Sequence, residues 1–425
     1  MHNIKQLQYQ TGGGITVRRS SYNLDYLTAI DRLTDQLDSH RGVLLASSFE
    51  YPGRYTRWDL GFINPPLELS SRGLQMQIRA LNNRGEILLP ELFSALQGNV
   101  DIADIEFTFS AISLQIRATD EVSQEELRSR RPSVLSVLRS IVALFRSGED
   151  PYLGLYGAFG YDLGFQFEDV ERHQSRSDSD RDLVLYLPDQ IVVADHRTEE
   201  AISFNYEFVC RSWKSASRTE TTGGFRRTGE ELMFSPGNTV STGCDHQAGE
   251  YAACVEKALA EFRLGNLFEA VPGQVFFEPC KSSPAQIFRR LKASNPAPYG
   301  ALINLGEQEY LVAASPEMFV RVENNQIETC PISGTIKRGV DAIGDAEQIR
   351  RLLNSRKDES ELSMCTDVDR NDKARVCVPG SVKVIGRRQI EMYSRLIHTV
   401  DHVIGELDQA YDALDGFLAH TWAVT

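Results

Sequence analysis

The first half of the chain contains a series of short β-like runs, and this pattern limits it to folds with substantial sheet. The runs lie at residues 42–49, 74–81, 104–118, 182–196 and 200–210. Between them, one segment places apolar side chains at helical spacing, at Val134, Leu138, Ile141, Val142 and Phe145. That spacing predicts an amphipathic helix over residues 133–147. We therefore expect a mixed α and β region in which sheet dominates.

Residues 212–246 differ from their surroundings, since they are rich in Ser, Thr, Gly and charge and poor in aliphatic side chains. This composition is typical of a linker or a long surface excursion. It divides the chain into an N-terminal region, residues 1–211, and a second region, residues 247–425.

Four segments of the second region have readable patterns. Residues 250–265 predict a helix that Gly265 ends as a C-cap. Residues 310–322 predict a strand that a Ser-Pro-Glu triplet interrupts. Residues 346–368 predict one long helix, and residues 394–407 predict either a strand or a helix.

The composition excludes several classes of protein. No run of about twenty apolar residues occurs, and the first ten residues lack the apolar centre of a secretory signal, which predicts a cytoplasmic protein. The seven cysteines are scattered without a CxxC pair, so they indicate reduced thiols rather than disulfides or a zinc ribbon. The net charge of −14, from 59 acidic and 45 basic residues, argues against a nucleic-acid or membrane partner.

A run of three small residues, Ser333, Gly334 and Thr335, precedes two cations, Lys337 and Arg338. Glycine permits backbone conformations that other residues resist, and the hydroxyls can bond to free amides, which favours a turn. The alternative is an anion cradle, in which the small residues admit a ligand. The two cations are interpreted as surface charge.

Two carboxylates, Asp358 and Glu361, stand three residues apart on the predicted long helix. They can point the same way, as a Mg²⁺ site requires, but a solvated acidic face gives the same pattern. Residues 367–372 imitate the start of an EF-hand loop. The sixth position of that loop holds Asp372 instead of the required Gly, which excludes a calcium loop.

Two further residues have open interpretations. His398 lies among apolar neighbours and is first interpreted as a buried core histidine. Glu317 follows a Ser-Pro pair, as an acid in the first turn of a helix would, and the alternative is a general acid. The chain has no GxSxG, Walker A or dinucleotide-binding pattern, so nucleophilic-serine, P-loop and Rossmann enzymes are excluded.

Taken in order, seven segments of the second region resemble the chorismate-utilising enzymes, and within them component I of anthranilate synthase. They are GNLFEAVPGQ, NPAPYG, AASPE, ETCPISGT, RKDESELSM, DVDRND and YSRLIH. The segments LLASSFEYPGRYT and GLYGAFGYD resemble the N-terminal region of the same family. The resemblance implies an α+β fold of large, mainly antiparallel sheets, packed as a two-layer sandwich with helices outside.

The resemblance also implies roles for particular residues. Gly334 and Thr335 would bind the substrate chorismate, and Glu361 would hold the cofactor Mg²⁺ with support from Asp358. Glu317 matches the general acid for the departing C4 hydroxyl, and His398 matches a histidine on the leaving-group side. In this reaction ammonia attacks C2, the hydroxyl leaves as water, and pyruvate is eliminated to give anthranilate, the first step of tryptophan biosynthesis.

Two positions distinguish this chain from sibling enzymes that the resemblance covers. Isochorismate synthases carry a lysine base where this chain has Glu269, and aminodeoxychorismate synthases carry a nucleophilic lysine where it has Ser333. Ammonia must therefore come from outside. Because the resemblance is to the fused long form, we expect a glutamine amidotransferase behind this region, and we also expect a homodimer. An aminodeoxyisochorismate-type enzyme, which aminates without releasing pyruvate, stays an alternative.

Regulation and completeness are further expectations from the resemblance. Relatives sense tryptophan through LLES and NPSPYM motifs, of which Ser47, Pro298 and Tyr299 are present, whereas Ala46 and Gly300 depart from the pattern. The family continues into a GAPK segment that is not in this sequence, which predicts a truncated chain with an incomplete site. We expect residues 1–425 alone to be inactive, and an inactive fragment that binds chorismate or tryptophan is the alternative.

Overall fold

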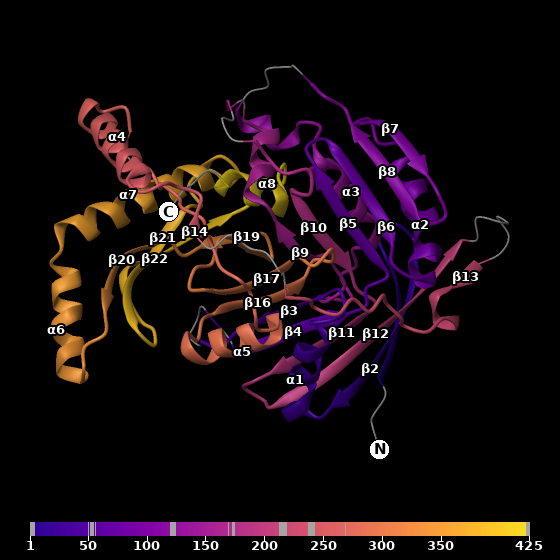
Figure 1. Ribbon diagram of the computed structural model, residues 1–425. Coiled ribbons are helices and arrows are strands. Elements are labelled where there is room, and N and C mark those ends of the chain that lie inside the picture. The colour runs from indigo at the N-terminus through magenta and orange to yellow at the C-terminus, as the bar shows by residue number, and fades with distance from the viewer. Residues whose placement is uncertain are drawn as a thin grey trace.

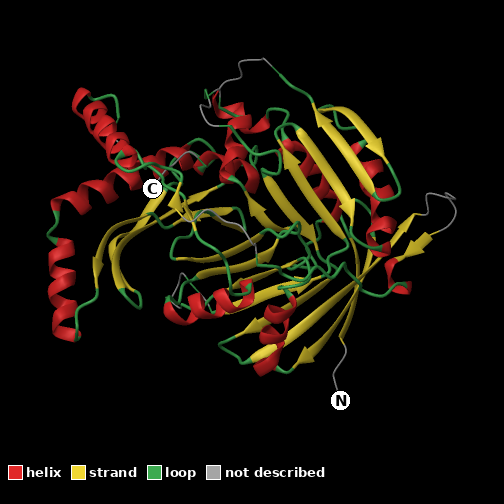
Figure 2. Cartoon of the chain, viewed as in Figure 1, coloured by secondary structure: helices red, strands yellow, loops and turns green. Residues whose placement is uncertain are grey.

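The computed structural model describes residues 5–49, 51, 55, 57–119, 125–168, 170–171, 175–211, 219–236, 243–267 and 269–421. Within these residues the strands form a nine-stranded, a six-stranded, a five-stranded and a two-stranded sheet (Figures 1 and 2). The strand pairings are antiparallel throughout the described sheets. The expected α+β fold with mainly antiparallel sheets is confirmed.

The nine-stranded sheet combines both halves of the chain. Its order is β1 (Lys5–Gln10), β2 (Thr16–Leu24), β12 (Glu200–Arg211), β11 (Gln190–Asp195), β4 (Trp58–Ile63), β3 (Gly42–Ala46), β16 (Tyr299–Asn304) and β17 (Tyr310–Ser315), with β13 (Thr219–Thr221) beside β12. Strands β16 and β17 come from the expected second region, so this sheet joins it to residues 5–211. The expected boundaries at 211 and 247 stay predictions, and residues 212–218 and 237–242 of the expected linker lie outside the described residues.

The six-stranded sheet has the order β7 (Ile102–Phe107), β8 (Ala111–Ile116), β6 (Gln75–Ala80), β5 (Leu67–Arg72), β10 (Leu183–Leu187) and β9 (Tyr156–Phe159). Helices α2 (Asn83–Leu96) and α3 (Val134–Phe145) lie against one of its faces (Figure 1). The expected helix is confirmed as α3, and its buried side chains join the largest apolar core. Val142 is the exception, since it is 44% exposed although its spacing predicted burial.

The nine-stranded and six-stranded sheets pack on each other through a second apolar cluster. Val43 and Phe62 of β3 and β4, with Ile303 of β16, meet Val184 and Tyr186 of β10. These side chains are almost fully buried. Apolar side chains on the facing sides of two sheets give the two-layer packing that the resemblance implied.

The five-stranded sheet is formed by the second half alone. It contains β18 (Arg321–Glu323), β19 (Gln326–Thr329), β22 (Leu396–Glu406) and β20 (Ile332–Lys337) in that order, with β21 (Lys383–Met392) on the other side of β22. Residues 394–407 are therefore mostly strand, and the triplet at 315–317 separates β17 from β18 as expected. Residues 316–320 form no helix, so Glu317 is not an acid in a first helical turn.

The single long helix expected over residues 346–368 is wrong. The structure has two helices, α6 (Ala342–Leu353) and α7 (Arg356–Ala374), along the five-stranded sheet (Figure 1). The break has a local cause, because the side chain of Ser355 accepts a hydrogen bond from the amide of Asp358 and caps the start of α7. A serine that can cap a new helix competes with continuing the old one.

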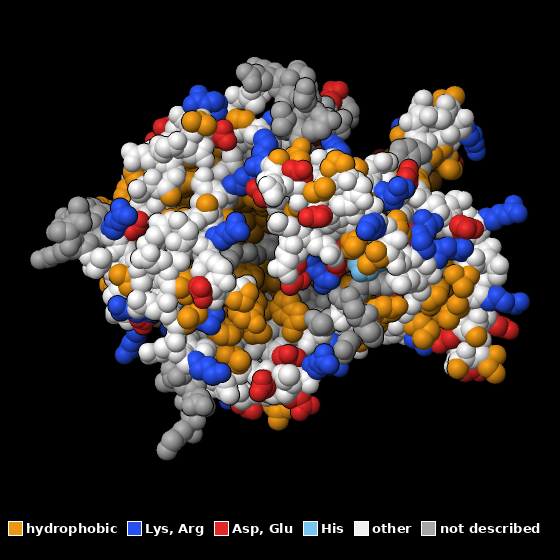
Figure 3. Space-filling model, turned by 180° about the vertical axis from the view of Figure 1, so that it is seen from behind, with side chains coloured by type: hydrophobic (Ala, Val, Ile, Leu, Met, Phe, Trp, Pro, Cys, Tyr) orange, Lys and Arg blue, Asp and Glu red, His pale blue; other side chains and the backbone are white. Residues whose placement is uncertain are grey.

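The remaining helices are α1 (Tyr26–Gln36), α4 (Glu250–Leu264), α5 (Pro284–Ser294) and α8 (Ala413–His420), and β14 (Gly243–Cys244) pairs with β15 (Phe276–Phe277). Gly265 ends α4 with a φ of +79°, as predicted. Helix α4 projects from the molecule and buries none of its side chains, which leaves apolar residues such as Leu264 exposed (Figures 1 and 3).

Two expectations from the composition concern the cysteines and membrane-spanning helices. All seven cysteines are free thiols, as expected. Among the helices of the described residues, none is both long enough and apolar enough to cross a membrane.

Candidate active site

A bulge in β20 brings backbone close to the start of α7. The register of β20 against β22 shifts between Ile332 and Thr335, and Gly334 lies in the shift with a φ of +86°. A Cβ atom at Gly334 would lie 2.6 Å from Thr399 Oγ1 and 3.1 Å from the Cβ of Asp358. Glycine is therefore required both by the left-handed backbone and by the close approach of two neighbouring elements. Gly334 thus forms the turn that the sequence predicted, and the same residue packs against Asp358 of α7.

Thr335 and His398 form a pair across the sheet. They are opposite each other in the register of β20 and β22, and Thr335 Oγ1 lies 2.8 Å from His398 Nδ1. Thr335 is exposed, whereas His398 is 7% exposed. Burial lowers the pKa of His398, although a hydrogen bond to the Gly334 backbone opposes this. His398 is thus a buried histidine, as first interpreted, and it is also bonded to an exposed hydroxyl.

Three carboxylates from separate segments act electrostatically on the buried thiol of Cys365 in α7. Burial raises the pKa of Cys365 to about 12, and the charges of Glu269, Glu361 and Glu317 contribute to the rise. The pKa of Glu269 is raised as well, by burial and by the charge of Glu361. The fold therefore brings Glu269 and Glu317 to the helix that carries Asp358 and Glu361. Cys365 itself stays protonated and is no nucleophile.

The carboxylates of α7 differ in their surroundings. The Asp358 side chain is 20% exposed and that of Glu361 is 43% exposed, and Lys357 Nζ lies 2.9 Å from Glu361 Oε2. Glu317 is half-buried, and its amide donates to Ser315 Oγ. Within the part of the chain that the structure describes, no group of three or more His, Cys, Asp or Glu side chains lies close enough together to hold a metal ion.

Arg338 is not the free surface charge that the sequence predicted. Its guanidinium binds both carboxylate oxygens of Asp345, near the start of α6, and donates to the Tyr393 carbonyl at 2.7 Å. The hydrogen bond from Arg338 holds the pKa of Asp345 below its usual range. Arg338 therefore ties β20 to α6 and to the β21–β22 hairpin, while Lys337 is exposed as expected.

The three residues expected to sense tryptophan lie together. Strands β3 and β16 pair with Ala46 opposite Gly300, which places Ser47 beside the start of β16. The Ser48 amide donates to the Ala297 carbonyl at 2.9 Å, and the Ala297 amide donates to Ser48 Oγ at 3.0 Å. Pro298 and Tyr299 follow Ala297 directly. Residues 47–48 and 297–299, about 250 positions apart in sequence, therefore lie side by side.

A buried carboxylate beneath these two segments was missed. Asp59 in β4 is fully buried, accepts the Ser47 amide at 3.1 Å, and lies 3.1 Å from both Lys292 Nζ and His196 Nε2. Glu391 in β21 was also missed, although it is fully buried opposite His398. A single acid within a β-like run has no motif around it, so only the packing reveals these two residues.

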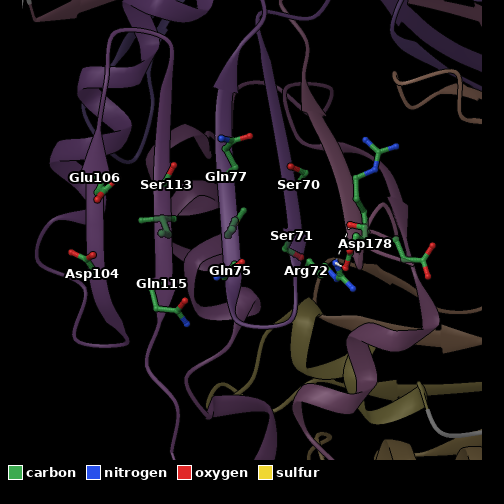
Figure 4. Close-up of a pocket in the computed structure, with 14 residues that line it drawn as sticks. Ser70, Ser71, Arg72, Gln75, Gln77, Asp104, Glu106, Ser113, Gln115 and Asp178 are labelled. Atoms are coloured by element: carbon green, nitrogen blue, oxygen red, sulfur yellow. Dashed lines mark hydrogen bonds and ion pairs between the residues drawn. The ribbon is translucent and has the colours of Figure 1, made fainter. Parts of the chain in front are cut away.

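A pocket of about 440 Å³ lies on the six-stranded sheet, away from all these residues. Figure 4 shows Ser70, Gln77 and Ser113 side by side on neighbouring strands, with Arg72 and Asp178 at one end. Its lining is polar and contains none of the predicted site residues. It is the open face of the sheet, opposite the face that α2 and α3 cover.

Comparison with known proteins identifies the family of the chain. The profile of the chorismate-binding enzyme family matches residues 103–425. An anthranilate synthase of Azospirillum brasilense is 53% identical over 99% of this chain, and component 1 of the Serratia marcescens anthranilate synthase is 30% identical over 94% of it. This chain covers 57% of the Azospirillum protein and 78% of the Serratia protein.

A solved structure has the same fold. Anthranilate synthase component I from Streptococcus pneumoniae superposes with a TM-score of 0.55 at 19% identity, over 89% of this chain and 72% of that one. The structural match shows the fold, and the profile match over most of the chain shows the family. The chain belongs to the family of chorismate-binding enzymes, and the anthranilate synthases are among its relatives in sequence.

Proposed function

We propose that this chain is the ammonia-using part of an anthranilate synthase. It would add ammonia to chorismate and eliminate pyruvate to give anthranilate. The observation that carries the proposal is the convergence of two groups of residues at one place. The Gly334 bulge lies beside the start of α7 and leads into Thr335, which pairs with His398, and the charges of Glu269, Glu317 and Glu361 all act on Cys365 of the same helix.

The side chains suit the steps of this reaction. Thr335 is exposed and presents a hydroxyl for a substrate oxygen, next to Gly334, whose own backbone is buried. Glu317 is half-buried at the position that the resemblance gives to the general acid, from which it would donate a proton to the departing C4 hydroxyl. Burial lowers the pKa of His398 and so favours the neutral ring, which would act on the leaving-group side as a hydrogen-bonding group.

The carboxylates also suit a magnesium ion, which we propose as the cofactor. Mg²⁺ is usually held by one or two protein carboxylates, with waters and substrate oxygens as the other ligands. Glu361 and Asp358 supply two carboxylates on one helix, and the raised pKa of Glu269 partly reflects repulsion from Glu361 that a cation would relieve. When bound, Mg²⁺ would orient and polarise the ring carboxylate of the substrate.

The nitrogen would come from ammonia that a glutamine amidotransferase, as a fused domain or a subunit, releases from glutamine. Ser333 supports this proposal, because it occupies the position of the nucleophilic lysine in aminodeoxychorismate synthases and cannot present an amine. Ser333 is buried, and its Oγ bonds to no described residue. Assembly as a homodimer and a cytoplasmic location are part of the same proposal.

We also propose that tryptophan binds at Ser47, Pro298 and Tyr299. The pairing of β3 with β16 brings these residues together, and the ring of Tyr55 lies 5.7 Å from that of Tyr299. Titration with tryptophan up to millimolar concentration tests this binding. No heat of binding at that concentration would contradict it.

Chorismate binding tests the proposed substrate on this chain directly. We expect calorimetry with Mg²⁺ to detect binding, and Thr335→Val to weaken it about tenfold or more, because a hydrogen bond to a charged partner contributes about 1.5–3 kcal/mol. Thr198→Val, in the exposed turn between β11 and β12, is the matched control. Equal binding by the parent and the Thr335 variant would contradict the proposed site.

Product analysis tests the reaction. The protein purified from its own cells should form anthranilate, detected by fluorescence, and pyruvate in equal amounts from chorismate, ammonium and Mg²⁺. An aminated product without pyruvate would instead favour the aminodeoxyisochorismate-type reaction. Residues 1–425 alone are expected to be inactive in this assay, and anthranilate formed by them would overturn that expectation.

A further inference from the structure

Tyr393 lies between the two sites described above. It begins the turn that joins β21 to β22, and it is 5% exposed. One side of its ring stacks on Phe49, with ring centroids 4.4 Å apart and an angle of 18° between the planes. The ring of His398 lies 5.3 Å away at 75°, in an edge-on contact. Tyr393 therefore contacts both Phe49, which follows Ser47 and Ser48 (the Ser47 segment, residues 47–49), and His398 of the candidate active site.

The hydroxyl of Tyr393 reaches two further parts of the same site. It donates to Glu391 Oε2 at 2.7 Å, and it lies 3.4 Å from the carbonyl oxygen of Pro316, the residue before Glu317. Glu391 is fully buried and stands opposite His398 in the register of β21 and β22. The hydroxyl thus fixes the ring relative to the strand of His398 and to the segment that carries Glu317.

The main chain of Tyr393 is fixed as well. Its amide donates to the Leu396 carbonyl at 2.8 Å, and its carbonyl accepts from Arg338 at 2.7 Å. A ring held at its backbone, its hydroxyl and its stacked face has little rotamer freedom. Such a ring can hold a neighbouring side chain in one orientation, which is what a support for a catalytic group requires.

We propose that Tyr393 is a positioning residue, which holds the His398 ring against Thr335 and passes changes in the Ser47 segment to it through Phe49. The inference rests on the proposed function, because it takes His398 as part of the site. Ser47 Oγ donates to the Phe49 carbonyl at 3.3 Å, so the Ser47 side chain is bonded directly to the main chain of Phe49. Two rings then connect the proposed effector segment to the proposed substrate site.

The test uses the imidazole nitrogens of His398, observed by nitrogen-15 NMR on the full chain without substrate. The signal of His398 is assigned by its loss in His398→Gln, and Thr335→Val gives the reference spectrum of a ring without its Thr335 partner. Tyr393→Leu removes the ring and should shift the Nδ1 signal to that reference position. Tyr393→Phe keeps the ring and should retain most of the parent signal.

Phe49→Leu is the decisive variant, because Phe49 stacks on Tyr393 and not on His398. We expect it to shift the His398 signal in the same direction as Tyr393→Leu but by less. The matched control is Tyr186→Phe, which deletes a hydroxyl bonded to the Asn304 carbonyl at 3.0 Å in another buried position. It should leave the His398 signal unchanged even if it lowers stability.

An unchanged signal in Phe49→Leu would overturn the coupling, and an equal shift in Tyr186→Phe would overturn the positioning role. If Tyr393→Leu fails to fold, Phe49→Leu still decides, because it removes the ring stacked on Tyr393 and leaves Tyr393 in place. In the active protein, Tyr393→Leu should lower kcat by up to about 100-fold with little change in KM, since misplacement of a reacting group affects the chemical step. Failure of the proposed function would appear differently, as absence of chorismate binding in the parent.

Discussion

The six-stranded sheet and the five-stranded sheet differ in the balance of apolar and charged side chains that pack against them. Against the six-stranded sheet, helices α2 and α3 bury a continuous apolar core that contains Leu88, Leu138 and Ile78, with one buried ion pair, Arg84 and Asp189, at the start of α2. Against the five-stranded sheet, α7 buries charged groups, of which Lys373 is fully buried and Asp369 is 5% exposed. The Lys373 ammonium lies 2.8 Å from Asp369 and also contacts Thr329, and His420 of α8 lies 3.3 Å from the same ammonium.

The two regions therefore depend to different degrees on apolar burial and on paired buried charges for their stability. Apolar burial stabilises a fold without requiring particular partners. Buried charges require a partner for every group, and they fix the geometry around them when those partners are present. The candidate site lies on the five-stranded sheet, next to Glu391 and Asp401, which are both fully buried. Rigid polar contacts of this kind suit a site that must orient a substrate.

Lys373→Met should have the largest effect on the free energy of unfolding. It leaves Asp369 buried without its cation, which costs about 3–5 kcal/mol. Urea unfolding measures the loss. Adding Asp369→Asn to the same chain should recover part of it, because the uncompensated charge is then gone.

Lys357→Met is the control on the same helix. Its side chain is 81% exposed and pairs with Glu361 at the surface, so its loss should cost less than about 1 kcal/mol. If Lys373→Met lowered the free energy of unfolding no more than this control, the buried charges along α7 would not contribute to stability as proposed.

Leu88→Ala tests the apolar side. Leu88 is fully buried in α2, and removing its side chain leaves a cavity, which should cost about 2–5 kcal/mol. This loss should not depend on pH, unlike that of the charged network. Leu27→Ala in α1, where the side chain is 79% exposed, should be nearly neutral by the same urea measurement. A strongly pH-dependent loss in Leu88→Ala would contradict the distinction between the two regions.

Gly334→Ala should have an intermediate effect and act on the bulge itself. A left-handed backbone costs about 1–2 kcal/mol for a residue with a Cβ, and here the added atom would also meet Thr399 and Asp358. Gly380→Ala separates the two terms, because Gly380 has a φ of +81° and no atoms within 4 Å of the added Cβ. Thermal unfolding should show a larger loss for Gly334→Ala, and equal losses would contradict the close approach to α7.

The smallest expected effect is on the pH dependence of stability, and Asp369→Asn tests it; the loss of stability at neutral pH, which comes from leaving Lys373 buried without its anion, is a separate effect. Burial alone would raise the pKa of Asp369, but the hydrogen bond with His420 and the charge of Lys373 outweigh it and lower the pKa. The carboxylate therefore stabilises the fold fully above its unfolded pKa of about 3.9, and this contribution disappears as pH falls through the folded value.

Urea midpoints measured from about pH 6 down to about pH 3 should consequently fall less steeply for Asp369→Asn than for the parent. Asp178→Asn is the control, since that carboxylate is fully exposed in the turn before β10 and its replacement should leave the slope unchanged. Identical acid slopes in the parent and Asp369→Asn would remove Asp369 from the charged network.

Much of the fold followed from local patterns. The spacing over residues 133–147 predicted α3, and Gly265 predicted the end of α4, because both depend on interactions within a few residues. The break between α6 and α7 was missed, since the segment has helical periodicity throughout and only the cap at Ser355 divides it. Val142 was predicted to be buried, but periodicity does not say how wide a face the neighbouring sheet covers.

The residues of the candidate site divide in the same way. The ordered motifs are sufficient to name Gly334, Thr335, Glu317, Glu361 and His398 as candidates. Asp59, Glu391 and Lys373 have no such signal, because each is one charged residue in an ordinary strand or helix. Their importance comes from partners that lie far away along the chain, such as Lys292 for Asp59 and Thr329 for Lys373.

Motif order and local periodicity are written along the chain, so they are enough to predict the family, the sheet-rich fold and the residues that face the substrate in the proposal. Three features depend instead on contacts between segments that are distant in sequence. Arg338 binds Asp345 and the Tyr393 carbonyl, the charges of three glutamates act on Cys365, and Tyr393 lies between Phe49 and His398. Such contacts form only when the sheets and helices pack, so no short stretch of sequence contains them.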